Sequence, residues 1–402
     1  VVYTRIDDGG FDNGRYTAEP FFVERQEPGR IYSYRIVAVN AGGESFPSEI
    51  VAACRVPDER GRVLIVNGFD RVSGPVSQRC DSLAGFRTDL DGGVPDRRDI
   101  TFIGPQEVFD PAQARCEVDS LALGACGCDY AADVIGGNTF DYAALHGRSV
   151  AAAGYSFCSM TARRAADGWD AAEYPVVDLI LGKQRRTVVG RGVRGEEFEA
   201  FPADLQHTIS DYLMQGGNLF VSGSYVASDL EAETASEADR RFAREVLHCV
   251  AAGMEVSADQ PEARRGRVRV MTPEAAFSRG EYRFNDAYGP DYYRVETADR
   301  LRPAGDGAFP VMRYAGGGVA GVAFGMPCPA AEAAGSAGPA DGAGNAGDAA
   351  DGGRLAAGGR GFVVGFPFET IVSEVQRDRL MRDALRFLTG GSRSGPDAGA
   401  GR

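Results

Sequence analysis

Five short apolar runs constrain the fold of this chain from residue 62 onward. They are "RVLIVNGF" (62–69), "VVDLILG" (176–182), "NLFVSG" (218–223), "GVAGVAFG" (318–325) and "GFVVGFPF" (361–368). Runs of this kind are typical of strands buried on both faces of a parallel sheet. Segments with helical periodicity follow three of these runs, at 202–217, 237–250 and 373–388. The sequence therefore predicts an α/β domain with a mostly parallel sheet over residues 62–389.

Residues 1–54 show a different pattern, that of antiparallel β structure. Within residues 31–53, Tyr32 and Tyr34 alternate with Ser33 and Arg35, and a Gly- and Asn-rich stretch at 40–45 predicts an exposed hairpin. The residues that resemble the closing strands of a fibronectin type III domain are Tyr32, Tyr34, Ala38, Asn40, Gly43, Ser45, Pro47 and Ser48. A whole domain of that type takes about 100 residues. The resemblance therefore implies a partial β-sandwich whose apolar face is exposed or leans on the α/β domain.

Taken together, the two parts resemble secreted bacterial multidomain proteins labelled xanthan-lyase-like. The resemblance is carried by "VLIVNGFDRVSGP", "VIGGNTFDYAALHG", "VVDLILGKQRRT", "GGNLFVSGSYVASD" and "GFPFETI", spread over residues 62–372. It implies a flavodoxin-like, class I glutamine-amidotransferase-like sheet and a location outside the cytoplasm: secreted, periplasmic or on the cell surface. It also implies polysaccharide or peptidoglycan, and other domains of the same polypeptide, as partners.

Two stretches rich in Gly, Ala and Asp, at 329–359 and 390–402, contain little that a core can bury and are predicted to be disordered. The charged stretch 55–61 is predicted to be a linker. The predicted organisation is thus a fibronectin-like segment (1–54), a linker (55–61) and an α/β domain (62–389), with a disordered insertion at 329–359 and a disordered tail.

Charge and cysteine content narrow the range of partners. The formal net charge is -14, which disfavours nucleic acid, and no apolar run is long enough to span a membrane. Eight cysteines occur with irregular spacing and without a CxxC pair. Buried free thiols with one or two incidental disulfides are therefore expected, and no metal site or cofactor is predicted.

In an open α/β sheet, ligands bind beyond the carboxyl ends of the parallel strands. The polar residues predicted to gather there fall after the apolar runs or in the long loop before residue 149. They are Asn67, Asp70, Ser73, Asn138, Asp141, His146, Lys183, Gln184, Ser222, Ser224, Tyr225, Asp229 and Glu369.

Three of these residues are candidates for catalysis. Ser224 lies at a strand-to-turn junction, where some hydrolases carry a nucleophile, and His146 is the histidine placed freely enough to act as its base. His207, on a helix face, is expected to be exposed, and His248, near a helix end, to be packed. Lys183 is the only lysine in a chain otherwise rich in arginine, which suggests a need for a compact ammonium group. The simpler alternatives are a small-residue turn at Ser224 and a solvated charge at Lys183.

Two functions follow from these patterns. The first is a non-catalytic or unassigned module that binds a ligand or organises neighbouring domains of a cell-envelope or polysaccharide-processing protein. The alternative is a hydrolase that acts on a glycan, or on a peptidoglycan amide or ester, through a cleft at the carboxyl edge of the sheet. Hydrolase or lyase activity elsewhere in a longer polypeptide is compatible with either.

Overall fold

The computed structural model describes residues 1–44, 48–68, 142–165, 167–169, 172–189, 196–256, 259–270, 277–286, 295, 297–325 and 359–390, together with a short hairpin of β7 (Val76–Cys80) and β8 (Leu83–Arg87). These residues form a mixed α/β structure around one 14-stranded sheet. The predicted sites at Asp70, Ser73, Asn138 and Asp141, the insertion up to residue 358 and the tail from 391 lie outside the described residues.

The centre of the sheet consists of parallel strands. They are β6 (Arg62–Asn67), β9 (Ser156–Thr161), β10 (Val176–Gly182), β13 (Asn218–Gly223) and β20 (Gly361–Val364), in the spatial order β9-β6-β10-β13-β20. Numbered along the chain, this order is 2-1-3-4-5, with the direction of winding changing between β6 and β10. Strands β6, β10 and β13 lie where the apolar runs predict them, and β10 is buried along its whole length.

Antiparallel strands complete the sheet beyond β20, in contrast to the prediction. They are β19 (Val319–Phe324), β18 (Phe309–Tyr314), β15 (Arg267–Val270) and β16 (Glu281–Arg283), and the pair β14 (Cys249–Val256) and β17 (Thr297–Pro303) joins through β19. Among the described strands of this sheet, four pairings are parallel and nine antiparallel. The expectation of a mostly parallel sheet is therefore wrong, because a buried run does not reveal the direction of its neighbour.

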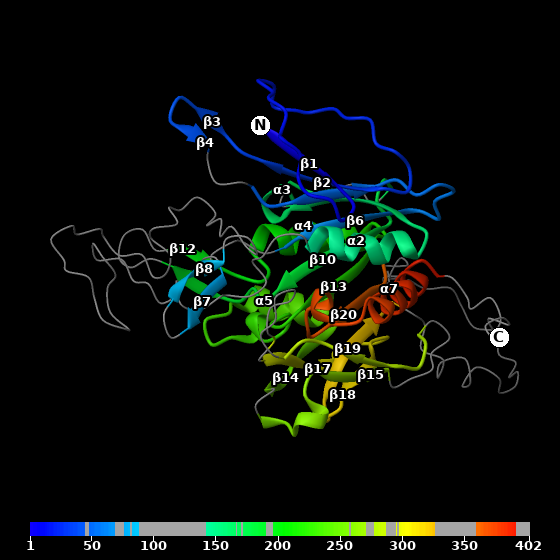
Figure 1. Cartoon of the computed structure of the whole chain (residues 1–402). Coiled ribbons are helices and arrows are strands. Elements are labelled where there is room, and N and C mark those ends of the chain that lie inside the picture. The colour runs from blue at the N-terminus through cyan, green and yellow to red at the C-terminus, as the bar shows by residue number, and fades with distance from the viewer. Residues whose placement is uncertain are drawn as a thin grey trace, which may run out of the picture.

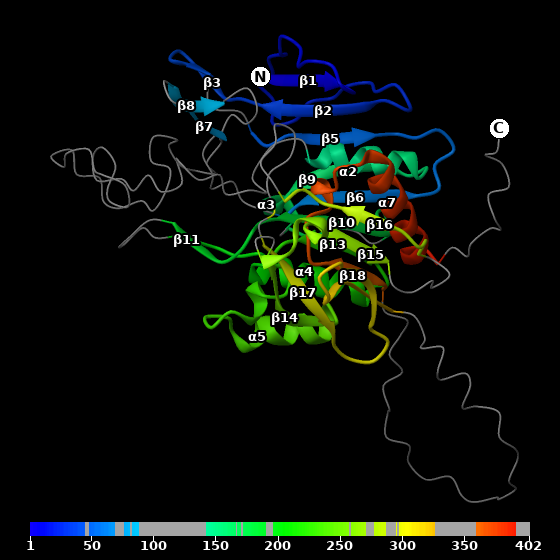
Figure 2. The ribbon, with the colours of Figure 1, turned by 60° about the horizontal axis from the view of Figure 1, so that its bottom comes forward.

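The N-terminal strands extend the same sheet on its other side. β1 (Val2–Ile6) pairs with β2 (Ile31–Ile36), which pairs with β5 (Val51–Cys54), and β5 is antiparallel to β9. Figure 2 shows β1, β2 and β5 in succession before β6 and β10. The predicted linker 55–61 thus connects two strands of one sheet. The hairpin of β3 (Val39–Asn40) and β4 (Gly43–Glu44) is exposed, as expected.

Helices cover both faces of the parallel strands and give two cores (Figure 1). On one face lie α2 (Tyr142–Ala152) and α7 (Glu374–Leu388), on what is called here the α2/α7 side. The other, the α4 side, carries α3 (Ala162–Ala165), α4 (Ala203–Met214), α5 (Glu237–Arg241) and the π-helical turn η4 (Phe242–Val246). The apolar residues of α4 are buried in this second core, as its helical periodicity implies; they are Leu205, Ile209, Tyr212 and Leu213.

The remaining elements are short. Hairpin β11 (Thr187–Val189) and β12 (Glu196–Phe198) follows β10, and single turns occur at η3 (Asp229–Glu231), η6 (Glu262–Arg264) and η7 (Phe368–Thr370). The helix predicted to reach residue 250 ends earlier, because His248 adopts φ 50° and Cys249 begins β14. Among the described residues, no helix is long and apolar enough to cross a membrane.

At Gly147, α2 packs closely against the sheet. A Cβ atom there would lie 2.1 Å from Cζ of the buried Phe157 on β9. We expect Gly147→Ala to lower the free energy of unfolding by about 1–3 kcal/mol, because the overpacking outweighs the better helix propensity of alanine. Urea denaturation measures this change. Adding Phe157→Leu should recover part of the loss, whereas a single variant as stable as the parent would contradict the close packing.

Candidate functional site

Two separate polar groups of residues lie on the sheet, one on each side of it. On the α2/α7 side, His146 of α2 lies between Asp178 of β10 and Glu369 of η7. His146 Nδ1 is 2.8 Å from Asp178 Oδ2, and His146 Nε2 is 3.3 Å from Glu369 Oε2. We call these three residues the buried ion cluster, because no side chain in it is more than 1% exposed.

The surroundings of His146 in the buried ion cluster favour a protonated imidazole. Burial by itself lowers the pKa of His146, but the charges and hydrogen bonds of Asp178 and Glu369 outweigh it and raise the pKa from 6.5 to about 9. The Phe368 ring packs against the imidazole with 4.6 Å between ring centres. Since the two carboxylates contact opposite ring nitrogens, they cannot converge on one metal ion, and the described residues contain no group of metal-ligating side chains.

This arrangement separates Ser224 from its proposed base. Both ring nitrogens of His146 face carboxylates, so neither is available to a serine. Ser224 itself is fully buried, and its N–H donates to Gly182 O at 2.8 Å. Its Oγ has no hydrogen-bond partner in the described part of the chain. The structure therefore does not assemble a Ser224–His146 couple, and Ser224 occupies a tightly packed turn.

On the α4 side, a cavity of about 470 Å³ opens beyond the carboxyl ends of β10 and β13. We call it the edge cavity. Its walls come from the loop after β10, the turn after β13 and strands β14 and β17; the lining residues are Arg185, Arg186, Tyr225, Ser228, Asp229, Ala232, Met254 and Thr297. The Arg185 guanidinium lies 5.4 Å from the centre of the Tyr225 ring, and the Tyr225 and Thr297 hydroxyls are 2.7 Å apart.

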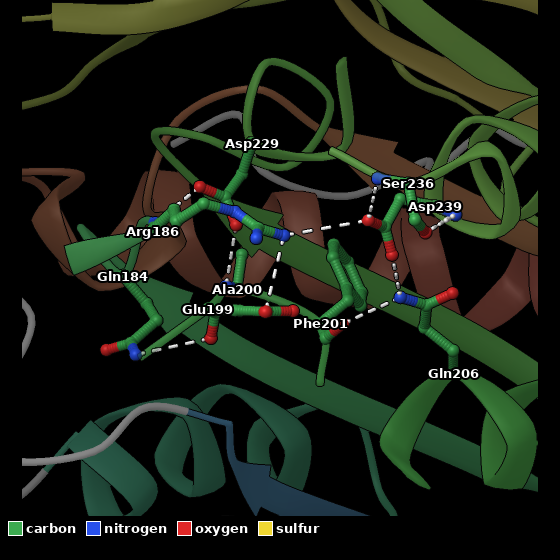
Figure 3. A network of polar contacts seen from close by, with 9 residues as sticks. All are labelled: Gln184, Arg186, Glu199, Ala200, Phe201, Gln206, Asp229, Ser236 and Asp239. Carbon is green, nitrogen blue, oxygen red and sulfur yellow. Dashed lines mark hydrogen bonds and ion pairs between the residues drawn. The ribbon is translucent and has the colours of Figure 1, made fainter. Parts of the chain in front are cut away.

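A polar network fixes the back of the edge cavity (Figure 3). The Asp229 carboxylate accepts hydrogen bonds from the backbone N–H groups of Arg186 and Ala200, the latter at 2.9 Å. Burial raises the pKa of Asp229, although these two N–H groups and the Arg186 charge oppose the shift. The Arg186 guanidinium lies 3.3 Å from Glu199 and 3.6 Å from Asp239. Its charge is thus compensated within the protein.

The other predicted site residues are divided between these two sides. By strand alternation, Asn67 and Ser222 lie on the α2/α7 side with Glu369; both are buried, and Asn67 Oδ1 and Ser222 Oγ have no partner among the described residues. Gln184 donates from Nε2 to Glu199 O at 3.2 Å on the α4 side, and Tyr225 lines the edge cavity. Lys183 is 9% exposed and takes part in a polar interaction, so it is not a solvated surface charge.

Sequence reasoning missed several residues of both groups. Asp178 carried a usable signal, since an acid inside the otherwise apolar run "VVDLILG" has to find a buried partner. Arg185 and Arg186 directly follow the predicted Lys183 and Gln184. Thr297 and Met254 carried no signal, because their place depends on antiparallel strands distant in sequence. The two other histidines are as expected: His207 is exposed, and His248 packs on Phe324 with a pKa lowered by burial.

Comparisons with known proteins give no family for this chain. No family model and no curated protein matches it. Solved structures with some likeness include a β-galactosidase from Rahnella sp. R3 (16% identity, TM-score 0.35, covering 62% of this chain and 27% of that one) and the exo-β-1,4-mannosidase Op5Man5 from Opitutaceae bacterium strain TAV5 (13% identity, TM-score 0.30, covering 60% and 29%). The chain therefore corresponds to less than a third of the length of either enzyme, and likenesses this low carry no argument about function.

Proposed function

We propose that this chain is a non-catalytic module that binds a saccharide in the edge cavity, as part of a glycan-processing or cell-envelope protein. The observation that carries the proposal is the position of the cavity, beyond the carboxyl ends of β10 and β13, where open α/β sheets bind ligands. Its volume falls within the range of roughly 300–1,000 Å³ that is usual for small-molecule sites.

The lining of the edge cavity suits a sugar ring. Met254, Ala232 and the Tyr225 ring offer apolar surface to the C–H faces of a sugar, while Thr297 and Arg185 offer hydrogen-bonding groups to its hydroxyls. Pockets for small ligands combine such apolar walls with a few placed polar groups. The compensated charge of Arg186 favours a role in the wall over direct pairing with a ligand.

A second candidate is hydrolysis of a glycan in the same cavity, because the cavity lies where a hydrolytic cleft is expected. Most glycoside hydrolases use a pair of carboxylates. Among the described residues, Asp229 is the carboxylate that lines the cavity, and both of its oxygens accept backbone N–H groups. Binding is therefore the better-supported function, and hydrolysis is distinguished from it by experiment.

The strand order 2-1-3-4-5 of the parallel strands supports a flavodoxin-like centre. It is compatible with the resemblance to xanthan-lyase-like multidomain proteins and with a secreted or cell-surface location. Neighbouring domains of the same polypeptide would then be the partners of this module.

Binding of cellobiose, mannobiose, lactose and chitobiose tests the proposed function, by saturation-transfer NMR and calorimetry. We expect at least one disaccharide to bind, and Arg185→Ala and Tyr225→Ala each to weaken its binding about tenfold, equivalent to about 1.4 kcal/mol. Arg313→Ala, which removes an exposed arginine of β18 outside the cavity, is the matched control and should bind like the parent.

Failure of all four sugars to bind, or binding that ignores both cavity variants, would contradict saccharide binding in the edge cavity. Nitrophenyl glycosides test the second candidate in parallel. Hydrolysis that Asp229→Asn abolishes would replace the binding proposal by the hydrolase, whereas absence of hydrolysis with intact sugar binding supports the non-catalytic module.

A further inference from the structure

A buried carboxylate, Asp299 of β17, joins the two walls of the edge cavity. Its Oδ2 accepts hydrogen bonds from the backbone N–H groups of Ala227 and Ser228, at 2.7 and 2.9 Å. Both belong to the turn that follows β13. Paired backbone N–H groups in such a turn are a common site for anions, and here a carboxylate of the protein itself occupies it.

The backbone of Asp299 is fixed independently of these bonds. Its N–H donates to Gly365 O at 2.8 Å, and its carbonyl accepts the Tyr314 hydroxyl at 2.8 Å. A Cβ on Gly365 would lie 2.3 Å from Asp299 O, so the strand and the turn after β20 are in direct contact. The backbone of Asp299 is therefore fixed by β17 and its neighbours, and the Asp299 carboxylate holds the turn at 224–228 through its hydrogen bonds.

The turn and the strand each contribute to the edge cavity. Ser228 and Tyr225 come from the turn, and Thr297 lies two residues before Asp299, on the same face of β17. Two links therefore join the walls: the bonds of Asp299 to the turn, and the contact of the Tyr225 hydroxyl with Thr297 Oγ1 at 2.7 Å.

We propose that Asp299 is a positioning residue that holds the turn 224–228 against β17 and makes the shape of the edge cavity depend on the ionisation of its carboxyl group. A carboxylate accepts two N–H bonds more strongly than a protonated acid does. Protonation therefore loosens the turn, and ligand binding weakens. The effect on a saccharide rests on the proposed function, whereas the effect on the turn does not.

The surroundings place this ionisation near neutral pH. Burial raises the pKa of Asp299 from 3.8 to about 7, against the hydrogen bonds of Ser228 and Ala227, which lower it. The titratable groups that interact with Asp299 are Asp229 of η3, Cys249 of β14 and Tyr314 of β18, and the pair Arg300 and Glu255 lies further along β17 and β14. Because the folded pKa exceeds the unfolded value, the stability contributed by this group is complete below about pH 4 and is lost as the pH rises through 7.

NMR of the full chain between pH 5 and pH 9 tests the proposal without any ligand. The probes are the amides of Ala227 and Ser228 and the methyl group of Met254, which lines the cavity on β14. We expect all three signals to shift with one midpoint near 7, and Asp299→Asn to abolish the transition. Asp229→Asn is the matched control, since that carboxylate binds other N–H groups. It should retain the transition at Ala227 and Ser228, with a lower midpoint, because the charge of Asp229 raises the pKa of Asp299.

The proposal is overturned if the two amides do not titrate, if their transition survives in Asp299→Asn, or if the Met254 methyl stays unchanged while the amides move. The ionised fraction of Asp299 falls about tenfold between pH 8 and pH 6, so the apparent Kd of a disaccharide that binds should rise over this range, by up to the same factor when only the ionised form binds. Sugar binding without this dependence overturns the role of Asp299 and leaves the proposed function standing. If the NMR transition occurs but no sugar binds, the proposed function is overturned and the role of Asp299 in holding the turn stands.

Discussion

Replacing His146 by alanine is expected to lower the free energy of unfolding by about 3–5 kcal/mol, because it leaves Asp178 and Glu369 buried without their shared cation. The three side chains come from α2, β10 and η7, so the loss affects the packing of a helix on the sheet and the segment that leads into α7. Urea denaturation at pH 6, where the imidazole is fully protonated, measures the change.

The matched control for this variant is His207→Ala, on the solvent-facing side of α4. His207 is 78% exposed, and its contact with Asp211 at 3.4 Å is a surface pair worth little. We expect a change within about 0.5 kcal/mol. A His146 variant no less stable than the His207 variant would show that the two carboxylates are neutral and that the buried ion cluster is not ionic.

Alkaline loss of stability is the second large effect expected of His146. Its pKa is about 9 in the folded protein and near 6.5 in the unfolded chain. The folded protein therefore binds more protons than the unfolded chain between these values. The stabilisation is complete below pH 6.5 and is lost as the pH rises through 9, by about 3 kcal/mol in total. Urea midpoints at intervals from pH 6 to pH 10 measure this fall.

His146→Gln separates this fall from the other titrations of the protein. Glutamine keeps hydrogen-bonding capacity but has no proton to lose, so the variant should be less stable at pH 6, and its stability should be nearly level only between about pH 8 and pH 9, above the fall that comes from Asp299. The stability change that comes from Asp299 lies at lower pH and should persist in both proteins. An equally steep alkaline fall in His146→Gln would mean that another group is responsible.

The strands of this fold were predictable where burial alone defines them. The ends of β10 and β13 coincide with apolar runs, and α4 and α7 follow from amphipathic spacing. The direction of β19 was not predictable, because the register of Gly321 with Val364 depends on an antiparallel return that the residues themselves do not encode. A strand that is buried on both faces of a sheet has the same apolar composition whether it runs parallel or antiparallel to its neighbour.

The candidate site was predictable as an edge of the sheet but not as a set of contacts. His146 and Glu369 were both expected at the carboxyl edge, and they do meet, but their shared partner Asp178 is the third residue of β10, in the interior of the sheet. Their function as an internal ion cluster depends on Asp178, whose side chain faces α2 only because of the alternation along β10. The hydrogen bond from the Ala227 N–H to Asp299 joins residues 72 apart in sequence, and no local sequence pattern predicts it.

The pairing of β5 with β9 has a mechanical consequence. A tensile load applied at the N-terminal strands passes through β1, β2 and β5 in series and reaches the α/β centre through the hydrogen bonds to β9, and not only through residues 55–61. The N-terminal segment therefore does not act as a freely swivelling spacer. An attached group would therefore keep a fixed orientation relative to the α/β centre. Breaking the pairing of β5 with β9 would expose the backbone N–H and C=O groups of β9 as an unpaired sheet edge, which could associate with other chains.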